Sequence, residues 1–282
     1  MANLKDHLLI FLRGIFMGVA DIIPGVSGGT IALITGIYER LVHGISSINS
    51  LVVKEVVGGK FKKAFFNVKK IDFALFIPLL FGIAISFLSL SHLMSYLLSV
   101  WTGITYAFFF GLILSSAFFV YKHASKNRFE NLLFLAVGFV FAFWFVGLKV
   151  LDANHSLVVI FFSAMIAICA MILPGISGSF MLLLLNQYEY MIGALKNLLF
   201  DKIIVFLFGA LIGILSFSKV LDWLLKNHKA KTMSFLTGVM IGSLRLPWGK
   251  VAASDNSLLF MIIAAVVGFA VVFVLEKKFG KN

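Results

Sequence analysis

Residues 22–45 read IIPGVSGGTIALITGIYERLVHGI, and residues 172–195 read ILPGISGSFMLLLLNQYEYMIGAL, so the two stretches align without a gap at an offset of 150 residues (172 minus 22). Each stretch places a Pro-Gly-x-Ser-Gly breaker inside an apolar run, with a Tyr-Glu pair further along. In membrane transporters, paired hydrophobic segments that are interrupted by Gly and Pro at matching places indicate the binding site. The doubled motif therefore decides how the rest of the chain is interpreted.

The composition predicts a membrane protein. The chain of 282 residues is 61% hydrophobic and 13% charged, with a mean hydropathy of +1.06, and a soluble fold could not cover so much apolar surface. The net charge of +12 comes from Lys and Arg residues that lie between the hydrophobic segments. This placement favours membrane topology and anionic lipid as its cause, and it argues against a nucleic-acid partner. We expect an all-α polytopic membrane protein.

Apolar runs predict the transmembrane segments. Six runs are about long enough to cross the roughly 30 Å of hydrocarbon in a bilayer: 74–98, 102–121, 131–150, 203–225, 232–248 and 257–275. Two further runs, 8–45 and 157–198, are broken near their middles by the motifs. We expect each of these to form a helical hairpin that enters and leaves the membrane on one side, whether it is re-entrant or crosses twice.

The distribution of basic residues predicts the orientation. With a cytoplasmic N-terminus, the outer connections carry only a few cations, whereas the cytoplasmic connections carry most of them. The outer ones are Lys149, Lys196, Lys202, Arg245 and Lys250. This bias satisfies the positive-inside rule, and the opposite orientation would violate it. We therefore predict a multi-pass membrane protein with both termini in the cytoplasm.

The repeat extends beyond the motif. Residues 82–98 match residues 209–225 at an offset of 127 (209 minus 82), and the lower offset reflects a Lys-rich cytoplasmic insertion at 46–72. We expect two repeats, 1–150 and 151–282, each made of one hairpin and three transmembrane helices. An odd number of crossings in each repeat makes the second one inverted. Inverted repeats place a site near the midplane and support alternating access.

The motif residues suit an anion. A helix that begins after each break has free backbone N–H groups and a partial positive charge at its end, and nearby hydroxyls add donors. The predicted phosphate-binding residues of the two breaks are Ser27, Gly28, Gly29, Thr30, Ser177, Gly178 and Ser179. The alternative is a tight helix crossing, because small residues are common where membrane helices pack.

Charged residues near the motifs are candidates for coupling and gating. Asp21 lies three residues before Pro24, where a charge is costly and usually functional. It could couple transport to protons or sodium, or cap the helix at the break. Glu39 and Glu189 each lie 15 residues after a motif proline, about 22 Å along a continuous helix. That distance favours paired gates, or simple anchors, near the two interfaces.

Three arginines are candidate phosphate ligands, because a guanidinium group offers a two-pronged fork of donors. They are Arg13, Arg40 and Arg245. The alternative for each is that its long side chain extends to the lipid headgroups.

The strings GVADIIPGVSGGTIALITGIYERL, MILPGISGSF and TGVMIGSLRLPW, in this order, resemble the polyprenyl-phosphate translocase family of the PopT type, formerly a domain of unknown function. The resemblance covers essentially the whole chain. It implies facing re-entrant hairpins in a prokaryotic plasma (inner) membrane. It also implies the return of undecaprenyl phosphate, a lipid carrier for cell-envelope polysaccharides, from the outer to the inner leaflet. The motif residues that it carries over are Asp21, Pro24, Gly25, Ser27, Gly28, Gly29, Thr30, Tyr38, Glu39, Pro174, Gly175, Ser177, Gly178, Glu189 and Arg245. The second copy departs from the first at Ser179 and Phe180.

Two other classes of protein fit less well. An ion-coupled carrier or channel for small anions would use the same hairpins without an opening to the lipid. An intramembrane enzyme would need a nucleophile with a base, or a metal cluster, and the six His residues are scattered along the chain without metal-ligand spacing. We therefore expect no enzymatic activity, no metal and no cofactor. The partners that we expect are the polyprenyl phosphate and membrane lipids, and the oligomeric state stays open.

Overall fold

The structure, a computed structural model, describes residues 4–23, 25–47, 58, 71–124, 128–151 and 153–279. These residues form helices and connecting turns, and no strand occurs among them. Four helices are long and apolar enough to cross a membrane: Phe73–Val100, Thr102–Lys122, Phe129–Val146 and Phe200–Asn227. The prediction of an all-α polytopic membrane protein is confirmed at this level. Pro24 and nearly all of the predicted insertion at 46–72 lie outside the described residues.

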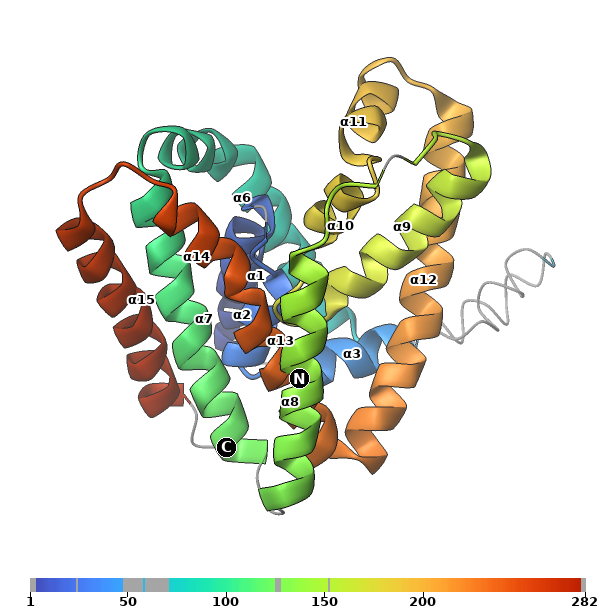
Figure 1. Ribbon diagram of the computed structural model, residues 1–282. Coiled ribbons are helices and arrows are strands. Elements are labelled where there is room, and N and C mark those ends of the chain that lie inside the picture. The colour runs from blue at the N-terminus through green and yellow to red at the C-terminus, as the bar shows by residue number, and fades with distance from the viewer. Residues whose placement is uncertain are drawn as a thin grey trace.

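Apart from α14, the described helices follow the same order in both halves of the chain (Figure 1). The first half contains α1 (Leu4–Ile22), α2 (Gly28–Ile34), α3 (Tyr38–Ser46), α6 (Phe73–Val100), α7 (Thr102–Ala124) and α8 (Arg128–Val146). The second half contains α9 (Leu157–Ile172), α10 (Gly178–Leu184), α11 (Tyr188–Lys196), α12 (Phe200–Asn227), α13 (Lys229–Ser243), α14 (Arg245–Ala252) and α15 (Leu258–Phe279).

The prediction that residues 232–248 form one transmembrane helix is wrong. Residues 232–248 were expected to form one helix, but α13 ends at Ser243 and α14 begins at Arg245. Pro247 explains the break, because proline has no N–H to donate to the carbonyl four residues earlier, which is that of Ser243. The segment predicted at 257–275 corresponds to α15, and that at 131–150 to α8, which ends at Val146.

Each hairpin contains a second break that the sequence analysis missed. Gly36 has a φ of +73° and Asn186, at the same place in the repeat, has a φ of +56°. This left-handed backbone ends α2 and α10 after seven residues each, and α3 and α11 start in new directions. Glycine and asparagine are the residues that adopt this conformation most readily. The prediction that Glu39 and Glu189 lie about 22 Å along a continuous helix is therefore wrong.

The helix pairs also recur between the halves. The α1 helix packs along α6 as α9 packs along α12, and α7 packs on α15 as α13 packs on α8. Gly82 and Gly209 occupy equivalent places in α6 and α12, where a Cβ atom would collide with the carbonyls of Phe11 and Phe161. Small residues let membrane helices approach this closely. Matched pairing is expected of a structural repeat, while the inversion of one half relative to the other stays a prediction.

Candidate functional site

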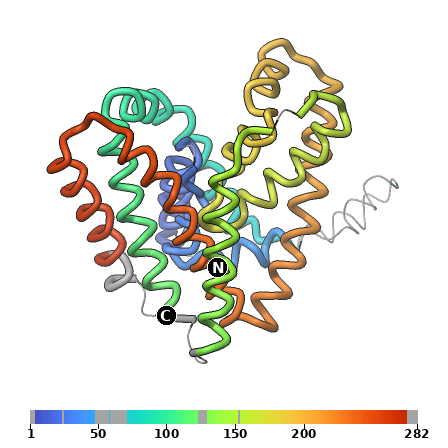
Figure 2. The backbone as a smooth tube through the Cα atoms, in the orientation of Figure 1, coloured from blue at the N-terminus to red at the C-terminus, as the bar shows by residue number. Residues whose placement is uncertain are grey.

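The two Pro-Gly-x-Ser-Gly breaks meet inside the protein, where the start of α2 lies against the end of α9. The backbone trace is shown in Figure 2. The Ser27 hydroxyl donates to the Leu173 carbonyl at 3.1 Å, and the Gly175 amide donates to the Thr30 hydroxyl at 2.9 Å. Ser27 and Thr30 are 1% and 0% exposed. Segments that lie 145 and 146 residues apart thus share one buried polar junction.

Glycine is required at the turn of each break. Gly25 has a φ of +86° and Gly175 a φ of +90°, in the region that other L-residues rarely adopt. A Cβ atom on Gly25 would lie 2.9 Å from a methyl carbon of Leu246 and closer still to its other methyl, whereas one on Gly175 would lie 2.9 Å from the Cα of Met240. The second turn is held against backbone atoms of α13, which cannot shift as a side chain can.

The first break already carries its own anion. The Asp21 carboxylate accepts a hydrogen bond from the Gly28 amide at 2.7 Å, and the Ser27 hydroxyl accepts from the Gly29 amide at 3.1 Å. Both glycines are buried, and a Cβ atom on Gly28 would lie 2.5 Å from an Asp21 oxygen. Asp21 was expected either to couple transport to an ion or to cap the helix at the break, and the hydrogen bond seen here is that of a helix cap. A phosphate that approached this end would compete with the carboxylate for the same amide.

The second break has no carboxylate in that place. Met171, the repeat partner of Asp21, is 43% exposed. Ser177 caps α10 weakly, because its hydroxyl lies 3.5 Å from the Phe180 amide, at the limit for a hydrogen bond. It pairs instead with the half-buried Ser179 hydroxyl at 2.8 Å, and Gly178 is buried against the Ala167 carbonyl. The two breaks therefore share a backbone but differ in charge.

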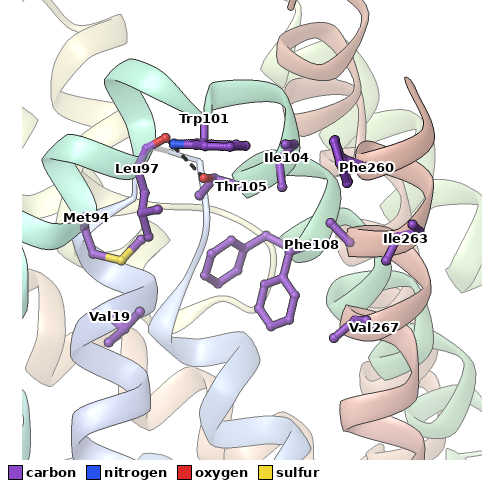
Figure 3. Close-up of a pocket in the computed structure, with 12 residues that line it drawn as sticks. Val19, Met94, Leu97, Trp101, Ile104, Thr105, Phe108, Phe260, Ile263 and Val267 are labelled. Carbon is purple, nitrogen blue, oxygen red and sulfur yellow. Dashed lines mark hydrogen bonds between the residues drawn. The ribbon is translucent and has the colours of Figure 1, made fainter. Parts of the chain in front are cut away.

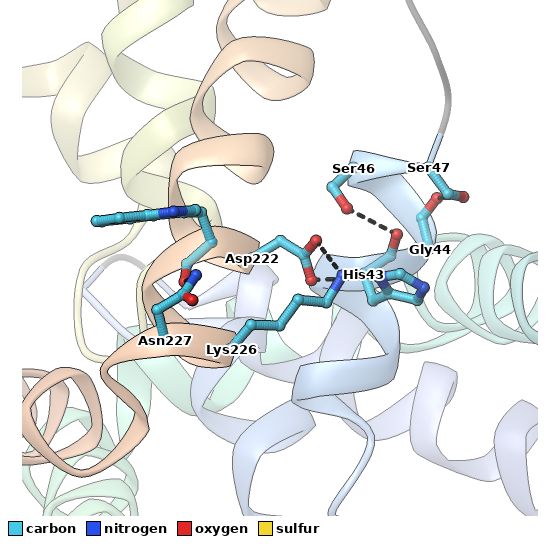
Figure 4. A network of polar contacts seen from close by, with 8 residues as sticks. His43, Gly44, Ser46, Ser47, Asp222, Lys226 and Asn227 are labelled. Atoms are coloured by element: carbon cyan, nitrogen blue, oxygen red, sulfur yellow. Dashed lines mark hydrogen bonds and ion pairs between the residues drawn. The ribbon is translucent and has the colours of Figure 1, made fainter.

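Ion pairs hold the α3 helix to its neighbours. Glu39 lies 2.6 Å from Lys229 at the start of α13. Arg40 binds Asp72 with two hydrogen bonds, of 2.7 and 3.0 Å, and these bonds lower the pKa of the Asp72 carboxyl below its ordinary value. His43 joins Asp222 and Lys226 of α12 in a third contact (Figure 4).

In the part of the chain that the structure describes, the equivalent helix α11 forms no such pairs. Glu189 is exposed and forms no ion pair within the described residues. Its neighbour Tyr188 is 37% exposed, whereas Tyr38 of α3 is 2% exposed. Sequence symmetry alone had suggested equal roles for Glu39 and Glu189, but the structure gives a partner to only one of them.

None of the three candidate arginines makes a hydrogen bond to the motif residues in the described part of the chain. Arg40 is paired with Asp72. The exposed Arg245 donates to the Phe143 carbonyl at 2.7 Å and lies 4.5 Å above the Phe143 ring. Arg13 is half-buried and close enough to Arg40 and Asp6 for their charges to act on it. Phosphate binding by these residues stays a prediction.

The sequence analysis missed several contacts of the site. It did not pair Arg40 with Asp72 or Thr30 with Gly175, because neither pair leaves a signal in the local pattern. The break at Gly36 did leave one, since Gly36 and Asn186 are the two residue types most tolerant of left-handed backbone and align in the repeat. Within the described residues, no group of three or more His, Cys, Asp or Glu side chains could hold a metal ion.

Fold and site together define a polytopic helical membrane protein built around two paired, broken helices. Comparison with known proteins then gives the family. The model of the undecaprenyl phosphate translocase-like family matches residues 17–259, and the chain belongs to this family.

Two curated relatives are similar over most of their length. A polyprenyl-phosphate transporter of Vibrio cholerae is 42% identical over 244 residues, which cover 86% of this chain and 78% of the relative. A polyprenyl-phosphate transporter of Staphylococcus aureus is 31% identical over 96% of each chain. No solved structure matches.

Proposed function

We propose that this protein transports polyprenyl phosphate, moving undecaprenyl phosphate from the outer to the inner leaflet of a prokaryotic plasma membrane so that the carrier is reused in cell-envelope polysaccharide synthesis. The observation that carries the proposal is the buried junction of two motif copies in a chain of this family. The protein acts as a transporter and not as an enzyme. Its termini lie in the cytoplasm.

The junction suits the headgroup of such a lipid. Moving an isolated phosphate through hydrocarbon costs many kcal/mol because its charge loses hydration. Hydroxyls and backbone amides at the junction supply replacement donors, and Ser27, Thr30 and Ser177 place three hydroxyls there. The isoprenoid chain stays in the lipid while the headgroup passes through the protein.

Asp21 supplies the coupling in this proposal. While it is ionised, its carboxylate holds the Gly28 amide and repels a phosphate. Binding of a proton or a sodium ion neutralises the carboxylate and frees the amide for the substrate. The gradient of that ion would then give the transport its direction.

Alternating access follows from the repeat. The α9 helix has 16 residues, about 24 Å, which is short of the roughly 30 Å of hydrocarbon and fits a re-entrant hairpin. We assign the end of the molecule near α3 to the cytoplasmic side. Ion pairs close that end, while α11 at the other end has none with its neighbours among the described residues. Inverted repeats exchange such closed and open ends during transport.

Enzymatic chemistry has little support in the geometry. A serine nucleophile needs an adjacent base. The Ser27 hydroxyl contacts a carbonyl and an amide, and the Ser177 hydroxyl contacts Ser179 and the Phe180 amide. In the described part of the chain, neither hydroxyl has a histidine or carboxylate as its hydrogen-bond partner.

The test is reconstitution in liposomes, with undecaprenyl phosphate followed between the two leaflets, with and without a proton or sodium gradient. We expect the wild type to equilibrate the lipid rapidly. Asp21→Asn should remove the effect of the gradient, because the amide side chain keeps an acceptor for Gly28 but has no charge to titrate. A wild type that moves inorganic phosphate and not the lipid would instead establish the small-anion carrier.

A further inference from the structure

Two connections between helices share a pattern of hydrogen bonds. One joins α6 to α7 at residues 97–105, the other joins α12 to α13 at residues 224–232, and we call each of them a corner. The Thr105 hydroxyl lies 3.2 Å from the Leu97 carbonyl, and the Thr232 hydroxyl lies 3.2 Å from the Leu224 carbonyl. The backbone amides of Trp101 and His228 donate to the same two carbonyls, at 2.9 and 2.8 Å. The offset of 127 residues found in the sequence therefore corresponds to two copies of one local structure.

Residues of each corner line a groove on the protein surface. The first groove, which we call the apolar groove, has a volume of about 560 Å³ and lies between α6, α7 and α15, with Val19 of α1 at its inner wall (Figure 3). The second, which we call the basic groove, has a volume of about 310 Å³ and is lined by Phe134, Leu224, His228, Lys231, Thr232 and Phe235. All of its residues from α12, α13 and the turn between them have a counterpart 127 positions earlier that lines the apolar groove.

The grooves differ at two of these matched positions. Trp101 and Ile104 of the apolar groove are replaced by His228 and Lys231 in the basic groove. Among the described residues, no titratable side chain lines the apolar groove. The two similar clefts thus both have apolar walls for a hydrocarbon chain, but only the basic groove also has a lysine and an imidazole.

We infer that the basic groove binds the phosphate-bearing end of a single-chain isoprenoid phosphate, and that the apolar groove takes only the isoprenoid chain. The inference rests on the proposed function, whose substrate it places at two lateral sites. The occupant is argued from charge complementarity, because a cation beside an aromatic and aliphatic wall matches a lipid with one anionic end.

Lys231, the cation of the basic groove, can exchange its carboxylate partner for a phosphate. Lys231 lies 2.7 Å from Glu130, and their side chains are 41% and 54% exposed. Ion pairs this exposed contribute little to stability because water screens them, so a phosphate can replace the carboxylate. Lys231 also lies 5.8 Å from the centre of the Phe134 ring, which keeps its ammonium group beside the apolar wall.

The neighbouring lysines do not compete for this role. Lys226 and Lys229 are ion-paired with Asp222 and Glu39, as Lys231 is with Glu130, so only their position separates them from Lys231. Neither lines the basic groove. Lys231 is therefore the lysine whose position fits the headgroup.

The experiment uses the full chain in nanodiscs of neutral phosphatidylcholine and measures binding of undecaprenyl phosphate and of undecaprenol, which has the same chain without the charge. We expect the wild type to prefer the phosphate by at least about tenfold, as a charge-assisted contact provides. His228→Gln with Lys231→Gln should abolish most of that preference, whereas Lys231→Arg should retain it. Lys250→Gln, which removes an exposed cation outside the groove, is the matched control and should change nothing.

A change in the apolar groove should affect both lipids equally and leave the preference for phosphate unchanged. Ala264→Phe fills it from α15 and should weaken the binding of undecaprenol and undecaprenyl phosphate by similar factors. A thermal unfolding curve for each variant establishes that the protein is folded.

Two results would overturn the inference. One is an unchanged preference for phosphate in the His228 and Lys231 double variant. The other is an equal loss of phosphatidylglycerol binding, which would make the groove a general surface for anionic lipids. If the wild type transports the lipid in liposomes while either result is obtained, the inference fails and the proposed function stands. If the wild type neither binds nor moves undecaprenyl phosphate, the proposed function fails as well.

Discussion

The two Pro-Gly-x-Ser-Gly breaks, which we call the first and second hairpin tips, have nearly the same backbone. They contribute different chemistry to the junction between them. The first tip reaches across with side chains, through the hydroxyls of Ser27 and Thr30. The second tip offers its backbone, through the Leu173 carbonyl and the Gly175 amide. Asp21 adds a carboxylate to the first tip, where the second has Met171. A duplicated turn can therefore keep its shape while its two copies take on different tasks.

The largest effect should follow from breaking the second turn. Gly175→Ala places a side chain at a φ of +90° and 2.9 Å from the Met240 Cα. The left-handed backbone alone costs roughly 1–2 kcal/mol, and the collision adds to it. We expect a large fall in the thermal unfolding midpoint and in the yield of folded protein.

Gly193→Ala is the matched control for this change. Gly193 lies inside α11, with nothing within 4 Å of an added Cβ, and alanine favours helix by about 1 kcal/mol. Its unfolding midpoint should stay the same or rise. Equal losses in both variants would mean that the turn at Gly175 is not special.

The next largest effect concerns the contact across the junction. Thr30→Val keeps the size of the side chain but leaves the buried Gly175 amide without its acceptor, which costs about 1–3 kcal/mol. Thr237→Val is the control, because the Thr237 hydroxyl donates only within its own helix, to the Met233 carbonyl. If the two valine variants unfold at the same temperature, the junction contributes no more than an ordinary helical hydroxyl.

Comparison of the two capping serines sharpens the difference between the tips. Ser27→Ala removes a cap at 3.1 Å and the bond to Leu173, and loss of a helix cap costs about 0.5–2 kcal/mol. Ser177→Ala removes a cap at 3.5 Å and should cost less. Denaturation of both variants in one detergent measures the difference, and a larger loss at Ser177 would reverse the assignment of roles.

The smallest effect is a dependence on pH at α3. The two hydrogen bonds from Arg40 lower the pKa of Asp72 in the folded protein. The pair therefore stabilises the fold above the unfolded pKa of about 3.9, and this contribution is lost as the pH falls through the folded pKa. The pair is partly exposed, so we expect no more than about 1 kcal/mol.

The measurement is the unfolding midpoint of the wild type and of Asp72→Asn between pH 6 and pH 3. Asparagine keeps an acceptor for the Leu75 amide that Asp72 caps, so the variant isolates the charge. The two proteins should differ at pH 6 and converge toward pH 3. A difference that grows as the pH falls would contradict the expected sign.

The sequence determined the membrane class, the apolar segments and the doubled motif with its offsets of 150 and 127 residues. Hydrophobic length and composition are local properties, and they therefore predict α6, α7, α8 and α12 well. The repeat also predicted which residues would recur at equivalent places, such as Thr105 and Thr232.

Only the tertiary structure decided which partner each residue meets. It showed that Asp21 caps α2, that Glu39 has an ion-pair partner while Glu189 is exposed, and that Ser27 and Thr30 reach the other half of the chain. It also divided each second arm into two short helices at Gly36 and Asn186. The physical reason is range, because hydropathy and periodicity act over a few residues, whereas a hydrogen bond between residues 145 apart depends on how every helix between them packs.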